Sequence, residues 1–114
     1  MRVNKQARKD ATLLMLHHQK LKYQVGEQDT LEVTAYTVAN WHSIPQSNAW
    51  ELLKELVHSR FVKRYTSNGE KPIILYALTK RGQNYVDRHV LECIAAHTRV
   101  VQWKISKYKR GFST

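Results

Sequence analysis

The sequence predicts a small α+β protein that is mostly α-helical. Apolar residues recur at helical spacing in four segments: residues 11–23, 35–42, 45–59 and 81–108. Two β-prone runs, 61–65 and 72–78, are separated by a polar stretch that contains Asn68-Gly69, which is typical of a β-hairpin. A chain of 114 residues has room for one domain with a modest hydrophobic core.

The N-terminal part predicts a basic segment followed by a helix. Residues 1–9 are rich in Lys and Arg and form either an arm or the first turns of that helix. Asp10 is the predicted N-cap, because its side chain can accept a hydrogen bond from the first helical turn. Residues 31–33 are compatible with a short strand before the next helix.

Two further helices flank a turn that contains Pro45. Thr34 is the predicted N-cap of a short helix over 35–42. Ser43 and Gln46 have the spacing of a capping box, which predicts the start of a helix that runs from about 45 to 59. The apolar residues of this helix form one inward stripe: Ala49, Leu52, Leu53, Leu56 and Val57.

The C-terminal part predicts one long helix over 81–108, capped by Thr79 and followed by a tail, 109–114. A seam of residues repeats at about 3.67 per turn. It consists of Val86, Val90, Ile94, His97, Val101, Ile105 and Tyr108. Because the helix carries more apolar residues than a small core needs, this seam predicts a symmetric homodimer. The alternative is that the helix folds back on its own domain, against Met15 and Leu16.

The order helix, strand, short helix, turn, amphipathic helix, hairpin, helix resembles the winged helix-turn-helix superfamily. The core of the resemblance is Val38 to Arg64, and Tyr76 to Gly82 is similar to the strand-to-helix exit of MarR-like and PadR-like regulators. The resemblance implies a three-helix core with a β-hairpin wing, residues 10–80, and a long C-terminal helix. Ser43 and Arg60 stand where the superfamily usually has glycine. A positive φ there costs another residue about 1 kcal/mol, so we expect a variant turn.

Charge favours a polyanionic partner, since 19 Lys and Arg oppose 9 Asp and Glu, for a net charge of +10. The resemblance places the helix over 45–59 in the major groove of DNA and the wing on the backbone or in the minor groove. The predicted contacts from the helix are Gln46, Ser47, Asn48, Trp50 and Lys54. Those from the wing are Lys63, Arg64, Thr66, Asn68 and Lys71.

The predicted function is therefore that of a sequence-specific double-stranded DNA-binding protein, a dimeric transcriptional regulator. Repression by occluding a promoter is the simplest mechanism, and the sequence does not distinguish an activator from a repressor. The alternative is a winged-helix module that docks onto a protein or RNA in a nucleoprotein complex, as in phage, plasmid or viral systems. The sequence indicates no particular small-molecule effector.

Other classes of function lack their motifs. The sequence shows no phosphate-binding glycine loop, nucleophile elbow or paired carboxylates, so we expect neither an enzyme nor a cofactor. The adjacent His17 and His18 point about 100° apart on a helix, and the other histidines lack ligand spacing, so we expect no metal site. Cys93 is the one cysteine and is expected to be a buried structural thiol. Without a signal peptide or a membrane-length apolar run, the expected location is cytoplasmic and no membrane is bound.

Overall fold

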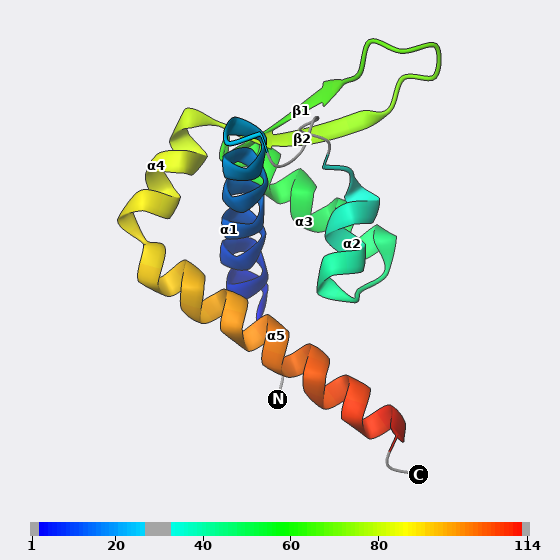
Figure 1. The fold of residues 1–114 in the computed structure, drawn as a ribbon, viewed down its shortest axis with the longest axis vertical. Helices are drawn as coiled ribbons and strands as arrows, with labels where there is room; N and C mark the ends of the chain where they lie inside the picture. The colour runs from blue at the N-terminus through cyan, green and yellow to red at the C-terminus, as the bar shows by residue number, and fades with distance from the viewer. Residues whose placement is uncertain (1–2, 27–32, 113–114) are drawn as a thin grey trace.

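The computed structural model describes residues 3–26 and 33–112, with side chains through residue 108. Its elements are α1 (Lys5–Gln24), α2 (Ala35–His42), α3 (Gln46–His58), β1 (Val62–Thr66), β2 (Ile74–Leu78), α4 (Lys80–Arg88) and α5 (Val90–Phe112). Figure 1 shows α1 at the centre, with α2 and α4 on opposite sides of it. The β1–β2 hairpin projects at one end, and α5 crosses the other end. The predicted α+β, mostly helical fold is confirmed.

The first helix begins earlier than the sequence predicted. The side chain of Asn4 caps α1 by accepting a hydrogen bond from the Ala7 N–H (2.7 Å), so residues 5–9 form helical turns. Asp10, the predicted cap, lies inside α1 and is buried. Its carboxylate accepts a hydrogen bond from the Tyr85 hydroxyl (2.8 Å), and the prediction of a cap there was wrong.

Only part of the predicted strand at 31–33 falls within the described residues. Val33 is buried and is not in a strand, although its carbonyl accepts a hydrogen bond from the Tyr76 N–H (2.8 Å). Residues 31 and 32 lie outside the described residues. The sheet of the described chain is the antiparallel pair β1–β2, in which Val62 is paired with Leu78 and Thr66 with Ile74.

The backbone at both ends of α3 has the geometry that the superfamily usually gives to glycine. Ser43, which ends α2, has a φ of 57°, and Arg60, which follows α3, has a φ of 65°. We expected a variant turn because these two positions lack glycine. The variant is not observed, since Ser43 and Arg60 themselves adopt the left-handed conformation. Pro45 precedes α3 without a side-chain cap, so the predicted capping box of Ser43 and Gln46 is also absent.

The predicted C-terminal helix is two helices. It breaks at His89, whose φ of −121° and ψ of 34° are not helical, and α5 continues to Phe112, beyond the predicted end. Thr79 caps α4 as predicted, accepting a hydrogen bond from the Gly82 N–H (3.0 Å). Val86 lies in α4 and is buried in the main core, so its prediction as a dimerisation residue was wrong.

Helix α5 packs across α1 within the same chain. Ala96 and Val100 contact Ala7 and Ala11, small residues that let the two helices approach closely. The rest of the predicted seam is not buried in this contact, although His97 packs against Trp41 beside it (ring centroids 5.2 Å apart). Val90, Ile94 and Ile105 are exposed, while His97 and Val101 are half-buried. Helix α5 therefore folds back on α1, as in the alternative prediction. The buried contact runs along Ala7 and Ala11, and the predicted partner Met15 lines a hollow together with Ile94 and His97.

No helix in the described ranges is long and apolar enough to cross a lipid bilayer.

Candidate nucleic-acid interface

Helix α3 has one buried and one exposed face. The predicted inward stripe is confirmed for Ala49, Leu52, Leu53 and Leu56, which are buried, while Val57 is half-buried. The helix residues predicted to contact DNA are all exposed: Gln46, Ser47, Asn48, Trp50 and Lys54. Ser47, Trp50 and Lys54 lie on the outer side of the helix, and the amides of Gln46 and Asn48, two residues apart, flank that side.

An aromatic side chain and a cation interact on this outer face. Trp50 is 45% exposed, and the Lys54 Nζ lies 5.1 Å from the centroid of its ring. Since Trp50 and Lys54 are one helical turn apart, this cation–π contact restrains both side chains. The face thus offers a flat apolar surface next to a positive charge.

The acidic residues of α3 are partly neutralised by α1. Glu55 is paired with Lys5 (N–O distance 2.7 Å) and lies 4.0 Å from Lys9. The hydrogen bond from Lys5 holds the pKa of Glu55 below its usual value. Glu51 is exposed on the same helix. Residues 45–72 carry five Lys and Arg against three acids, so the surface of this segment is only moderately basic.

The hairpin presents the second group of predicted residues. All five of them, Lys63, Arg64, Thr66, Asn68 and Lys71, are exposed. Ser67 closes the loop, because its N–H donates to the Ile73 carbonyl (3.0 Å) and its hydroxyl accepts from the Ile73 N–H (3.1 Å). At the base, β2 is anchored by four buried residues, Leu75 to Leu78. The polar end of the hairpin therefore extends from a fixed base.

A buried hydrogen-bond network fixes α2, and with it the turn, on α1. Thr12 donates to the Arg8 carbonyl (2.7 Å), so its oxygen accepts from His42 Nε2 (2.7 Å). His42 Nδ1 then accepts from the Arg8 guanidinium (3.1 Å). Burial, together with the charges of Arg8 and Lys104, lowers the pKa of His42 to about 3. The ring is therefore neutral, and it satisfies both partners.

Two lysines of α5 contact the end of α2 and the turn. Lys104 Nζ donates to the Trp41 carbonyl and Lys107 Nζ donates to the Ser43 carbonyl (3.3 Å). Each ammonium also lies over a tryptophan ring, Lys104 over Trp41 (4.8 Å) and Lys107 over Trp103 (4.9 Å). Such cations stabilise the negative end of a helix dipole. Sequence reasoning treated these lysines only as charges of a basic helix end.

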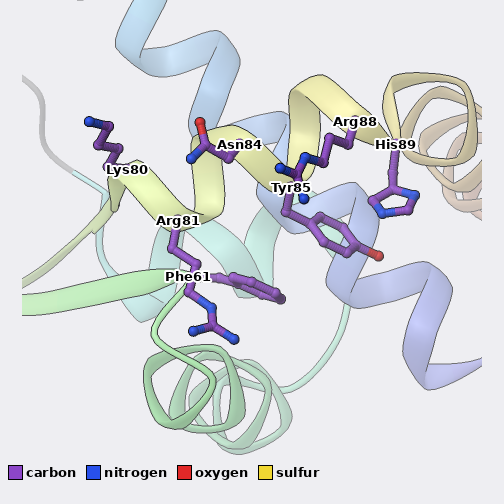
Figure 2. Close-up of a pocket in the computed structure, with 7 residues that line it drawn as sticks. All are labelled: Phe61, Lys80, Arg81, Asn84, Tyr85, Arg88 and His89. Atoms are coloured by element: carbon purple, nitrogen blue, oxygen red, sulfur yellow. The ribbon is translucent and has the colours of Figure 1, made fainter.

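A second basic site, missed by the sequence analysis, lies between α4 and the connection from α3 to β1. Figure 2 shows the residues that line this hollow: Phe61, Lys80, Arg81, Asn84, Tyr85, Arg88 and His89. The signal was present, because Arg81, Tyr85 and Arg88 are spaced i, i+4 and i+7 and so share one helical face. It was overlooked because the whole segment was assigned to a dimerisation helix.

The described part of the chain contains neither a cluster of metal ligands nor a reactive thiol. No group of three or more His, Cys, Asp or Glu side chains there is arranged to hold a metal ion. Cys93 is buried, as predicted, and burial with the charges of Asp10 and Glu92 raises the pKa of its thiol to about 11. A thiol with such a pKa is protonated and unreactive at neutral pH.

Comparison with known proteins reveals a similarity of fold. No family model matches the sequence, and no curated protein is significantly similar to it. The crystal structure of RV1404 from Mycobacterium tuberculosis is similar to this chain, with a TM-score of 0.58 and 20% sequence identity. The similarity covers 84% of this chain and 58% of RV1404, so the chain spans little more than half of that protein. At this identity the comparison indicates a shared fold only.

Proposed function

We propose that α2, α3 and the hairpin form a winged helix-turn-helix unit that binds double-stranded DNA in a sequence-specific manner. In this proposal α3 enters the major groove and the hairpin follows the backbone or the minor groove. The protein acts in the cytoplasm as a dimeric transcriptional regulator and performs no covalent chemistry.

The observation that carries the proposal is the two-sided character of α3. Its apolar side is buried in the core, while the polar side chains of Gln46, Asn48 and Lys54 are exposed to solvent. Gln and Asn amides can pair with two edge atoms of adenine, and a major groove about 12 Å wide accepts one helix. The exposed cations of the hairpin, Arg64 and Lys71, are suited to phosphates on either side of that groove.

The exposed face of α5 supports the dimer. It carries large apolar side chains whose exposed fractions are 42% for Val90, 48% for Ile94 and 50% for Ile105. Their spacing of four and eleven residues places them on one side of the helix. This side flanks the α1 contact made by Ala96 and Val100, and Ile94 lines a hollow beside Met15 of α1. A second copy of the same face would bury them, and the two-fold axis would pair two DNA half-sites.

Salt-dependent duplex binding tests the DNA proposal. Titration with random duplex DNA is expected to give submicromolar affinity that falls by about 0.9 log unit per phosphate contact for each tenfold rise in salt. Replacing Gln46 and Asn48 with Ala is expected to relax preference for a selected site, whereas replacing Arg64 and Lys71 weakens all duplexes alike. Weak binding without a salt slope would instead favour docking onto a protein or RNA complex.

The dimer has its own test. Ile94→Glu with Ile105→Glu is expected to shift the protein to monomer in sedimentation equilibrium, because the two charges cannot be buried in a symmetric contact. Ser106→Glu, a change of an exposed residue about 100° or more around α5 from Ile94 and Ile105, is the matched control. A wild-type chain that sediments as a monomer at every concentration would refute this part of the proposal.

A further inference from the structure

Three rings form a stacked row along the hollow between α4 and the α3–β1 connection. The centroids of Phe61 and Tyr85 are 4.8 Å apart and those of Tyr85 and His89 are 4.6 Å apart, with tilts of 35° and 39°. Figure 2 shows the three rings following one another from the connection to the end of α4. Such a row offers stacking contacts to a further planar ring.

Cations surround this row of rings. Arg81 and Arg88 are exposed and line the hollow with Lys80, and the residues that line it include no carboxylate. The guanidinium of Arg81 lies 5.6 Å from the centroid of Phe61, while Lys80 points away from the rings in Figure 2. Planar guanidinium groups pair with phosphate oxygens two at a time, which favours a phosphorylated ligand over a singly charged acid.

The hollow has a fixed wall. Gly82 allows α4 to approach the preceding connection closely, since a Cβ there would lie 2.1 Å from the Phe61 carbonyl oxygen. The Tyr85 hydroxyl is held by Asp10 (2.8 Å), and burial with this hydrogen bond raises its pKa to about 12. The volume of about 510 Å³ falls in the range of small-molecule sites, roughly 300–1,000 Å³.

We propose that this hollow binds a nucleotide, with the base stacked on the row of rings and the phosphate held by Arg81 and Arg88. The nucleotide is either free or part of a single strand, whose bases stack on aromatic side chains in the same way. The site shares no residue with the proposed duplex interface, so the two proposals stand or fall separately.

Titration of the full chain with deoxythymidine monophosphate, followed by NMR of labelled aromatic side chains, tests the proposal. We expect shifts at Phe61, Tyr85 and His89, and binding about tenfold tighter than that of thymidine or inorganic phosphate. Arg81→Gln with Arg88→Gln is expected to weaken binding about tenfold, because two charge-assisted contacts are lost. Arg99→Gln, an exposed arginine on α5, is the matched control and should bind as wild type.

A short oligothymidylate strand distinguishes the two sources. Tighter binding of the strand, competed by the mononucleotide, identifies a single-strand site, and equal or weaker binding identifies a free-nucleotide site. The proposal is overturned if the three rings do not shift, or if phosphate alone binds as tightly as the nucleotide. It is also overturned if the double Gln variant binds like Arg99→Gln while both retain the wild-type unfolding midpoint.

Discussion

The surface of α3 and the hairpin differs from the hollow beside α4 in how its charges are arranged. On the first surface the polar side chains project from a convex helix and a protruding hairpin. In the hollow, Arg81 and Arg88 stand around rings that contact one another. Both regions are basic. They are also neighbours in sequence, because α3 is followed by Ser59 and Arg60 and then by Phe61, which lines the hollow.

If the two proposals hold, geometry more than net charge selects the polyanion that each surface binds. A convex row of separate donors suits the edges and phosphates of a duplex, which is itself concave in its grooves. A hollow lined by stacked rings excludes a duplex, because paired bases do not expose their faces. The four predictions below test this contrast, from the largest expected effect to the smallest.

Gly82→Ala tests whether the hollow depends on close packing. The new Cβ would clash with the Phe61 carbonyl oxygen, which is rigid backbone, so unfolding free energy should fall by about 3 kcal/mol. Urea denaturation measures the loss. Gly69→Ala is the control, because its nearest neighbouring atom is 4.0 Å away and little change is expected. Equal stability of the two variants would contradict the packing described here.

Acid titration tests the network that holds α2 and so orients α3. The unfolded chain protonates His42 below pH 6.5, whereas the folded chain does not until about pH 3. The stabilisation is therefore complete above pH 6.5 and is lost by about 1.4 kcal/mol per pH unit as the pH falls toward 3. His42→Asn should lack this part of the slope in urea denaturation, and an unchanged slope would rule out a neutral His42.

Crossed variants test whether the two surfaces are independent. Arg64→Ala with Lys71→Ala should weaken duplex DNA binding about tenfold and leave nucleotide binding unchanged, since two phosphate contacts are removed from one surface only. Arg81→Gln with Arg88→Gln should weaken nucleotide binding about tenfold and leave duplex DNA binding unchanged. Fluorescence anisotropy with labelled duplex and calorimetry with nucleotide measure the two affinities. If either pair of changes weakened both ligands equally, the two regions would be one site.

Glycine substitutions at the ends of α3 test the strain in each region. Ser43→Gly on the duplex side and Arg60→Gly beside Phe61 should each raise unfolding free energy by about 0.5–1 kcal/mol, because both residues have positive φ. Ser47→Gly, in the first turn of α3, should instead lower it by about 0.5 kcal/mol, because glycine has the lower helix propensity. A loss of stability in Ser43→Gly would show that its left-handed backbone carries no strain.

The sequence predicted α3 and the hairpin well because their signals are local. The stripe from Ala49 to Leu56 faces one core, and Asn68-Gly69 marks a loop within a few residues of both strands. The exposure of the ten predicted contact residues follows from those assignments. Whether these residues touch DNA is a property of a complex and stays a prediction.

The C-terminal part was harder because periodicity alone does not show which partner a face meets. Val86 and Val90 fit one helical seam, yet the helix breaks at His89, where no glycine or proline marks the break. Because of the break, Val86 is buried in the core and Val90 is exposed to solvent. Similarly, Asn4 and Asp10 are both residue types that cap helices well, but Asn4 is the cap of α1. The Asp10 carboxylate instead accepts a hydrogen bond from Tyr85, which is 75 residues further along the sequence. Contacts of this range are not encoded in local patterns.

Two lysines of α5 connect this helix to the turn between α2 and α3. Lys104 and Lys107 donate hydrogen bonds to the carbonyls of Trp41 and Ser43, while the apolar side chains of Ile94 and Ile105 on the same helix are exposed. Since a helix moves nearly as a rigid rod, tilting α5 by pressure on its apolar side would pull these two ammonium groups away from the turn. The proposed association through that side would thus be mechanically linked to the angle at which α3 is presented.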